Sequence, residues 1–135
     1  MRVQPYLSFE GRCEEALEFY RSAVGAEVTA LMRFSESPDP GMNPPGSENK
    51  VMHSSFRIGE SELMATDGNC GGGSTFSGIS LTLTGKDDEE TARLFNALAD
   101  GGKIGMPLEK TFFASSFGML TDRFGVGWMV ITADA

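Results

Sequence analysis

The stretch FGMLTDRFGVGWMV, residues 117–130, decides the fold, because the chain has already used the same pattern once. Two apolar runs flank a polar turn at 121–125, which is typical of two strands joined as a hairpin. Residues 56–68, FRIGESELMATDG, repeat this arrangement, with Leu63-Met64-Ala65 in the place of Trp128-Met129-Val130. The chain therefore contains two copies of one hairpin, at an offset of 129 − 64 = 65 residues.

The segments that precede the two hairpins repeat as well. YLSFEGR, residues 6–12, aligns with SLTLTGK, residues 80–86, at an offset of 81 − 7 = 74. Apolar residues at helical spacing follow each segment and predict helices over 13–24 and 88–99, where one extra residue raises the offset to 75. A repeat of this length predicts two β-α-β-β-β modules, with a strand after each helix and before each hairpin.

Both predicted helices carry end signals. Gly25 and Gly101 follow the last apolar positions and predict the two stops. Asp87 and Glu90 have the spacing of a capping box at the start of the second helix.

Two segments interrupt the repeat. Residues 35–50 are rich in Pro and Gly, which excludes a helix or a central strand and predicts a mobile flap. The Gly-rich residues 67–78 predict a flexible connection. The expected organisation is one domain over 1–135, with modules over 1–68 and 79–135 and a linker over 69–78.

Charge and cysteine content narrow the functional classes. The formal net charge is −8 and no basic cluster is present, which argues against nucleic acid and anionic membranes and is compatible with a cationic ligand. No apolar run reaches the length of a membrane span, and the N-terminus does not resemble a signal peptide. Cys13 and Cys70 form neither a disulfide framework nor a zinc motif, so we expect a cytoplasmic protein with reduced thiols.

Strand alternation predicts which side chains line a binding site. Leu7, Leu81 and their apolar neighbours face the helices, which directs Tyr6, Ser8, Ser80 and Thr82 to the opposite side of the sheets. Each module covers one face of its sheet with a helix and leaves the other face open. Two modules side by side would then form a trough between their open faces.

The duplicated pattern resembles the vicinal oxygen chelate superfamily, and in particular its PhnB-like branch, also described as 3-demethylubiquinone 3-methyltransferase-like. The segments that carry the resemblance are PYLSFEGRCEEALEFY, LMATDG and GGKIGMPLEKTFFASSFGMLTDRFGVGWMV. The resemblance implies an α+β protein of the glyoxalase/bleomycin resistance/dihydroxybiphenyl dioxygenase fold. In that fold two tandem βαβββ modules form a curled mixed sheet around a trough. It also implies a homodimer.

The metal ligands of that superfamily are missing at the matching positions. The His and Glu ligands of its metal-dependent members would fall at Tyr6, Met64, Ser80 and Met129. Phenol, hydroxyl and thioether are poor ligands for the divalent ions that prefer carboxylate or imidazole. We therefore expect no catalytic divalent metal and no cofactor. A Gly-rich nucleotide turn between a strand and a helix is also missing, so the sequence does not support methyltransferase chemistry.

Several single residues have both a functional and a structural interpretation. His53, the only histidine, is a candidate general base in the trough or a hydrogen-bonded structural residue. Aromatic side chains near the C-terminus would either line a ligand site or pack in the core or dimer interface. The predicted ligand-binding residues are Tyr6, Ser8, His53, Met64, Ser80, Thr82, Phe113, Phe117, Trp128 and Met129.

These observations favour a glyoxalase-like protein without metal ligands that binds a small organic molecule. Two alternatives stay open: a metal-dependent lyase or dioxygenase of the vicinal oxygen chelate type, and a drug-sequestering protein of the bleomycin-binding type. The acidic charge suits the second alternative, whose members need no metal ligands.

Overall fold

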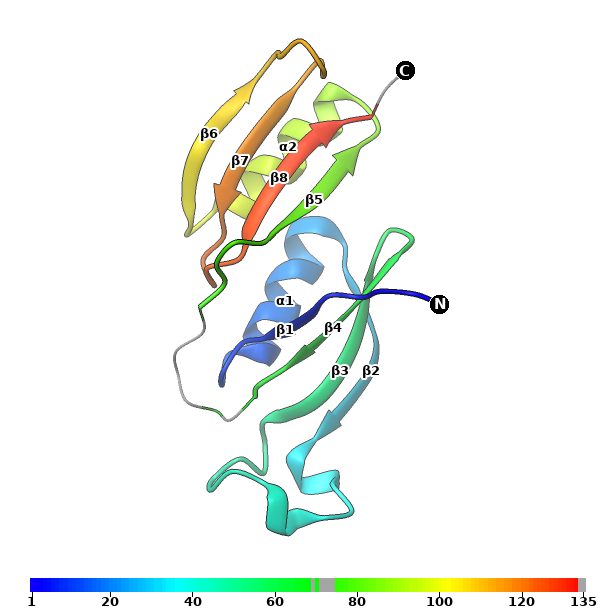
Figure 1. Ribbon diagram of the computed structural model, residues 1–135, viewed down its shortest axis with the longest axis vertical. Helices are drawn as coiled ribbons and strands as arrows, with labels where there is room; N and C mark the ends of the chain where they lie inside the picture. Colours follow the sequence, from blue (N-terminus) through cyan, green and yellow to red (C-terminus); the bar gives the residue numbers. More distant parts are fainter. Residues whose placement is uncertain (69, 71–74, 134–135) are drawn as a thin grey trace. The chain divides into compact units, whose positions relative to one another are not determined.

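The computed structural model describes residues 1–68, 70 and 75–133 and divides into two compact units, before and after position 74 (Figure 1). In the described residues each unit has one α-helix and four strands in the order β-α-β-β-β, as the repeat predicts. Of the predicted linker 69–78, residues 69 and 71–74 lie outside the described residues.

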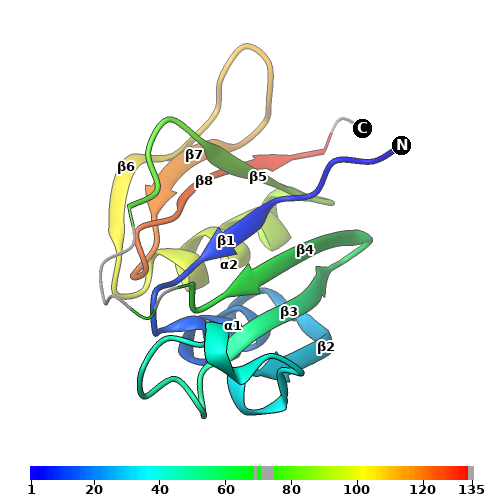
Figure 2. The ribbon, with the colours of Figure 1, turned by 60° about the horizontal axis from the view of Figure 1, so that its bottom comes forward.

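The first unit is built from a mixed sheet with the strand order β1-β4-β3-β2. The first strand pairs with the last in parallel, and the other pairs are antiparallel, so that β1 lies beside β4 (Figure 2). Its elements are β1 (Tyr6–Ser8), α1 (Cys13–Val24), β2 (Glu27–Arg33), β3 (Val51–Ile58) and β4 (Ser61–Thr66).

The second unit repeats this topology with the order β5-β8-β7-β6. Its edge strand β6 contains Pro107, which has no N–H to donate to a neighbouring strand and is therefore tolerated at an edge. The elements are β5 (Ser80–Gly85), α2 (Asp88–Ala99), β6 (Lys103–Glu109), β7 (Phe117–Thr121) and β8 (Gly127–Thr132).

Both helices have the predicted bounds, and their ends follow the sequence signals closely. Gly25 caps α1 with φ = 71°, a left-handed conformation that glycine adopts without steric cost. At the start of α2, the Asp87 carboxylate accepts a hydrogen bond from the Glu90 N–H at 2.8 Å. The returning Glu90 carboxylate accepts from the N–H of Lys86, one residue before the cap, so the predicted capping box is displaced by one residue.

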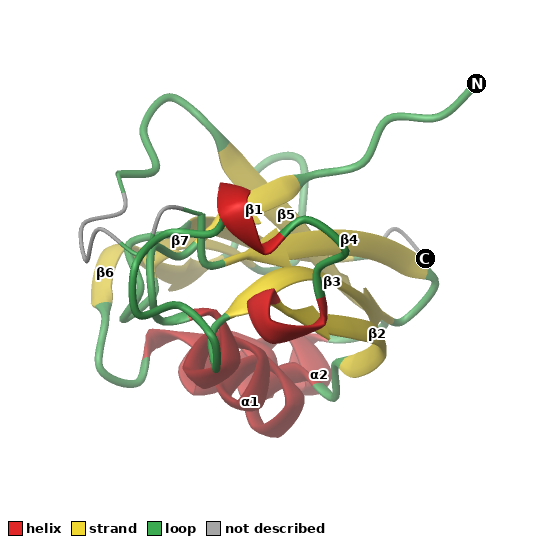
Figure 3. Ribbon diagram, turned by 90° about the horizontal axis from the view of Figure 1, so that it is seen from below, coloured by secondary structure: helices red, strands yellow, loops and turns green. Residues whose placement is uncertain are grey.

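Each helix covers one face of its own sheet and leaves the other face without a helix (Figure 3). In the first unit Tyr20 of α1 is fully buried and its ring stacks on Phe56 of β3, with centroids 6.1 Å apart. In the second unit Phe95 and Leu98 of α2 are buried, as are Trp128 and Val130 of β8. Burial of these large apolar side chains provides most of the stabilisation of each unit.

The segment 35–50 contains more structure than the sequence predicts. Two short 3₁₀ turns, Phe34–Glu36 and Pro40–Met42, correct the expectation that it holds no helix. Such single turns tolerate Pro and Gly because they need few repeating hydrogen bonds. The base of the segment is fastened by Phe34 N–H to Lys50 O at 3.0 Å and by Lys50 Nζ to Gly11 O at 2.9 Å. The mobility of its outer part stays a prediction.

The sheet register corrects the predicted alignment of the first strands. Met64 pairs with Tyr6 in one unit, whereas Met129 pairs with Thr82 in the other. If Met64 and Met129 are equivalent, Thr82 and not Ser80 is the counterpart of Tyr6, and the offset is 82 − 6 = 76 rather than 74. A shift of two residues keeps every side chain on the same face, which is why alternation alone did not reveal it.

Candidate functional site

The open face of the first sheet brings Tyr6 and His53 together. Tyr6 pairs across β1 and β4 with Met64, which pairs in turn with Ser55 of β3. His53 lies two residues before Ser55 and therefore on the same face. The Tyr6 Oη and His53 Nδ1 atoms are 2.8 Å apart, and the two rings lie 5.5 Å apart in a tilted arrangement.

The phenol of this pair keeps its proton at neutral pH. Tyr6 is 50% exposed, and its partial burial raises the pKa of the phenol, with a smaller contribution from the Cys13 thiol and an opposing one from Thr66. Tyr6 therefore stays protonated at neutral pH. In the tautomer with the His53 proton on Nε2, the Tyr6 O–H donates to Nδ1 and the Nε2–H group is a second donor.

A carboxylate lies just beyond the end of β1. The Ser8 hydroxyl donates to Glu10 Oε1 at 2.8 Å, and both side chains are partly buried. Gly68 makes this arrangement possible, because a Cβ atom at that position would collide with the Glu10 carboxylate and the Ser8 hydroxyl. The first unit thus holds an aromatic hydroxyl, an imidazole, a thioether and a carboxylate.

The predicted site residues of the second unit fall into three groups. Thr82 and Met129 are neighbours, with 4.0 Å between the Thr82 Oγ1 and Met129 Sδ atoms, and Ser80 pairs with Gly127 further along the same strands. Phe113 and Phe117 form an edge-to-face pair with centroids 5.1 Å apart. Trp128 is 3% exposed and alternates with Met129, so it lies on the helix-covered face of β8.

Trp128 has an evident structural partner within its own unit. Its indole N–H donates to Asp122 Oδ2 at 2.9 Å, and the other carboxylate oxygen accepts the N–H groups of Phe124 and Val126. Asp122 is itself buried. The carboxylate therefore organises the β7–β8 turn and anchors the indole in the core.

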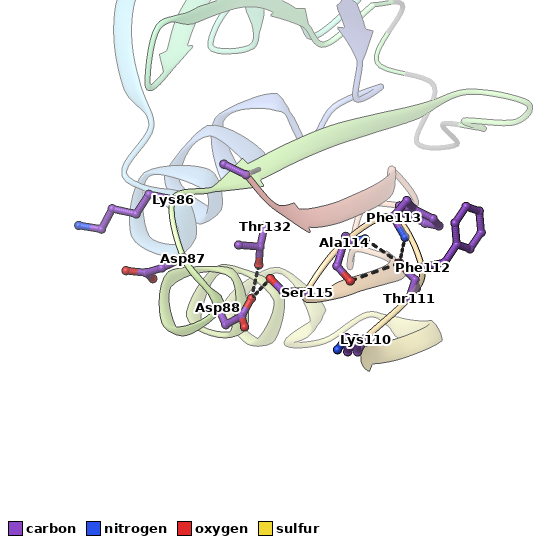
Figure 4. Close-up of a pocket in the computed structure, with 11 residues that line it drawn as sticks. Lys86, Asp87, Asp88, Lys110, Thr111, Phe112, Phe113, Ala114, Ser115 and Thr132 are labelled. Carbon is purple, nitrogen blue, oxygen red and sulfur yellow. Dashed lines mark hydrogen bonds between the residues drawn. The ribbon is translucent and has the colours of Figure 1, made fainter. Parts of the chain in front are cut away.

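A hollow of about 540 Å³ lies within the second unit, between the start of α2, the 110–115 loop and the end of β8 (Figure 4). The Asp88 Oδ1 atom accepts the hydroxyl of Ser115 at 2.6 Å and that of Thr132 at 2.7 Å. These hydrogen bonds lower the pKa of Asp88, with Ser115 as the larger cause. The remaining lining residues are Lys86, Asp87, Lys110, Thr111, Phe112, Phe113, Ala114 and Ala133.

The residues at the expected metal-ligand positions do not suit a divalent ion. Tyr6 is protonated and bonded to His53, and Met64 and Met129 present only thioethers. Across residues 1–68, 70 and 75–133, no group of three or more His, Cys, Asp or Glu residues is arranged to hold a metal ion. We therefore assign no chemical step to a divalent metal.

Sequence reasoning found part of this arrangement. It selected Tyr6, Ser8, His53 and Met64, and the first sheet brings Tyr6, His53 and Met64 together. It did not select Glu10 for the site, because only the folded end of β1 places that carboxylate beside Ser8. The contacts of Asp88 with Ser115 and Thr132 join residues far apart in the chain, and no local pattern indicated them.

Comparison with known families confirms the resemblance noted from the sequence. The family described as 3-demethylubiquinone-9 3-methyltransferase matches residues 1–131. The chain belongs to this family. It is 38% identical to Protein YjdN of Escherichia coli (strain K12), with 96% of this chain and 94% of that protein aligned.

Two solved structures of similar sequence share the whole architecture. Protein PA1353 from Pseudomonas aeruginosa is 40% identical, with 100% of this chain and 99% of that chain covered and a TM-score of 0.87. A putative 3-demethylubiquinone-9 3-methyltransferase, PhnB protein, from Bacillus cereus is 34% identical, with coverage of 98% and 100% and a TM-score of 0.82. These similarities place the chain in the PhnB-like branch.

The wider fold family is the one the sequence predicts. A glyoxylase/bleomycin resistance protein/dioxygenase domain from Frankia sp. EAN1pec has a TM-score of 0.67 at 12% identity, with 99% of this chain and 92% of that chain covered, which is a likeness of fold alone. The α+β assignment with two βαβββ modules is thereby confirmed. Neither helix of the described residues is long and apolar enough to cross a membrane.

Proposed function

We propose that this protein binds a small organic molecule on the open face of β1, β4 and β3, with Tyr6 and His53 as its polar contacts. The single observation that carries the proposal is the 2.8 Å hydrogen bond between Tyr6 Oη and His53 Nδ1 on a face without a helix. Two amphipathic rings oriented by a mutual hydrogen bond on an accessible sheet face are typical of a binding site rather than of a core.

The chemistry of the face indicates the kind of ligand. The His53 Nε2–H group is a donor for a carbonyl or similar acceptor, and the Met64 thioether offers an adaptable apolar contact. The Glu10 carboxylate beside Ser8 favours a ligand that also carries a positive charge, in agreement with the net charge of −8. The proposed class is therefore a small cationic or neutral molecule with an apolar body and a hydrogen-bond acceptor.

The test is a thermal-shift screen of metabolites, followed by calorimetry of each hit with Tyr6→Phe, His53→Gln and Phe113→Ala. Losing one neutral hydrogen bond should weaken binding about three- to tenfold in Tyr6→Phe and His53→Gln. Phe113→Ala is the matched control in the second unit and should bind as the wild type does. Hits that respond only to Phe113→Ala would instead assign the ligand to the hollow of Figure 4 and overturn the proposal.

Drug sequestration is a second candidate, favoured by the acidic charge. A cationic glycopeptide held mainly by electrostatics would lose affinity steeply as salt rises from about 0.01 M to about 1 M, because the Debye length falls about tenfold over that range. A ligand held by the Tyr6–His53 pair should respond weakly to salt. Salt titration of glycopeptide binding separates the two.

We also propose a cytoplasmic homodimer. Cys13 and Cys70 are free thiols, which suits a reducing compartment. The sheet of the first unit ends at the edge strand β2, where Val28 and Met32 are exposed. A partner copy would cover such an edge and prevent unspecific pairing. Sedimentation should give a dimer at micromolar concentration, and Met32→Arg should shift it toward the monomer; a monomeric wild type would refute the assembly.

A further inference from the structure

A row of methionines crosses the open face of the second sheet. Met106 of β6 pairs directly with Met119 of β7, and Met119 pairs directly with Met129 of β8. Residues that are directly opposite in antiparallel strands point to the same face, with Cβ atoms about 4.5–5.5 Å apart. The register therefore places the three methionines opposite one another across the sheet, with an irregularity of β6 on either side of Met106.

The line lies on the face that α2 does not cover. A Cβ atom at Gly118 would collide with the Phe95 ring of α2, so the neighbouring Met119 points to the opposite side. Leu120 of β7 and Trp128 and Val130 of β8 are buried, whereas Met119 and Met129 are half-buried and Met106 is 36% exposed. The three methionines thus lie on a partly accessible face and not in the core that α2 covers.

We propose that Met106, Met119 and Met129 form a binding site for a soft monovalent metal ion, Cu(I). Thioether is a soft ligand that selects Cu(I) over Mg²⁺, Ca²⁺ or Mn²⁺. The flexible methionine side chains from three adjacent strands allow the outer two to lean toward the central one. The Thr82 hydroxyl, close to Met129 Sδ, holds the side chain at one end of the row. This site is independent of the Tyr6–His53 pair, which belongs to the other unit.

The first experiment is an anaerobic titration with Cu(I), kept reduced by ascorbate, followed by NMR of ¹³C-methyl methionine. A Cys70→Ser background removes the more accessible thiol, which would compete for the ion; Cys13 is fully buried. We expect the methyl signals of the three row residues to shift together and saturate at one ion per chain. Met42, which is 80% exposed and outside the row, is the internal control and should not shift.

The second experiment compares the affinity of variants by competition with a chromophoric Cu(I) chelator. Changes even outside the ligand shell commonly weaken metal binding about 10- to 100-fold, so Met119→Leu should weaken it by at least about tenfold. Leucine conserves the volume of the side chain, and Met42→Leu is the matched control that should bind as before. Should Met119→Leu lower the melting temperature, Met106→Leu at the exposed edge provides the same comparison.

Two results would overturn the site. One is an unchanged Cu(I) affinity in both row variants. The other is a pattern of shifts in which the row methionines and Met42 respond alike, as they would to unspecific binding. Zn²⁺ added in place of Cu(I) should leave the row signals unmoved, and a shift of equal size would show that softness does not govern the site.

Discussion

The two units share one topology, but the carboxylate that links the start of the helix to the sheet comes from a different element in each unit. In the first unit Asp67, just after β4, accepts the backbone N–H of Cys13 at the start of α1 and that of Val51 at the start of β3, each at 2.7 Å. Asp67 is 1% exposed, so a buried carboxylate satisfies the hydrogen-bonding of two buried backbone N–H groups.

In the second unit the carboxylate belongs to the helix. Asp88, the first residue of α2, accepts the hydroxyls of Thr132 on β8 and of Ser115 on the loop before β7. Asp88 is exposed, and its donors are side-chain hydroxyls and not buried backbone N–H groups. Both units therefore link the start of the helix to the sheet through a carboxylate. The residue that provides this carboxylate differs between the units, and so does its expected contribution to stability.

The two units differ more in the side chains on their open sheet faces than in their topology. The row that crosses the first sheet reads Tyr6, Met64, Ser55 and Ala30, and the corresponding row of the second sheet reads Thr82, Met129, Met119 and Met106. One row presents an aromatic hydroxyl bonded to an imidazole, and the other presents thioethers. The two units therefore differ in side-chain chemistry on the faces that the helices leave uncovered.

The largest expected effect is on stability, and it distinguishes Asp67 from Asp88. Asp67→Ala leaves two buried backbone donors without their acceptor, at about 1–3 kcal/mol each, so we expect a loss of about 2–6 kcal/mol in the free energy of unfolding. Asp88→Ala is the matched change in the second unit and should have a clearly smaller effect. Urea denaturation of both variants measures the difference. Equal losses in the free energy of unfolding would contradict the proposed difference between Asp67 and Asp88.

A smaller effect distinguishes the structural role of Trp128 from a role in ligand binding. Trp128→Phe keeps a large ring but removes the indole N–H that donates to Asp122, and we expect a loss of about 1–2 kcal/mol. Ligands that respond to Tyr6→Phe should bind this variant with unchanged affinity. Weakened binding without destabilisation would show that Trp128 contacts the ligand, as the sequence predicts.

The alternation of apolar and polar residues predicted which face of a sheet a side chain lies on more reliably than it predicted which residues pair across strands. It assigned Tyr6 and Ser8 to the side away from the buried Leu7, and helical spacing gave both helices their observed bounds. It did not fix the register, because a shift of two residues leaves every face unchanged. Trp128 illustrates the same limit: its aromatic character indicated a ligand contact, whereas its position beside Met129 places it on the buried face.

The polar partners depend on distant parts of the chain, and this is why they were not predicted. The only histidine attracted attention as a residue type, but its hydrogen bond with Tyr6 requires β1 and β3 to lie on either side of β4. Asp67 begins the Gly-rich segment that was predicted to be a flexible connection, although it is among the most buried polar residues of the described chain. Its role follows from where two elements begin, Cys13 and Val51, and not from its neighbours in sequence.

Alkaline pH should weaken the first unit selectively. Burial raises the pKa of the Cys13 thiol from 9.0 to about 12 and outweighs the hydrogen bond with Ser54, which lowers this pKa. Between these values the unfolded chain releases the proton and the folded chain keeps it, so the free energy of unfolding falls as pH rises from about 9 to about 12. Hydrogen exchange should show increased opening in α1 but not in α2, where no cysteine lies.

Two controls accompany this measurement. Cys13→Ala should remove the selective loss of protection in α1 above pH 9. At neutral pH an iodoacetamide derivative should label Cys70, which is half-buried, and leave Cys13 unmodified, because the buried thiol is neither accessible nor ionised. Rapid labelling of Cys13 in the folded protein would contradict the burial on which the prediction rests.

The smallest expected effect on stability belongs to Tyr6→Phe, and it sharpens the difference between the open faces. The phenol is half-exposed, so losing its hydroxyl should change the free energy of unfolding by no more than about 0.5 kcal/mol. The same change should alter His53 itself. While Tyr6 donates to Nδ1, the neutral imidazole carries its proton on Nε2. In the variant that constraint disappears and the two tautomers mix.

Nitrogen-15 NMR of the single histidine reports this directly. While the ring is neutral, Nδ1 of the wild type should have the shift of an unprotonated nitrogen, and in Tyr6→Phe it should move toward the protonated value. Thr82→Val, at the corresponding place in the second unit, should leave His53 unchanged. A wild-type spectrum with the proton on Nδ1 would mean that His53 donates to Tyr6. The donor offered to a ligand would then be the phenol, and the ligand class proposed from Nε2–H would have to be revised.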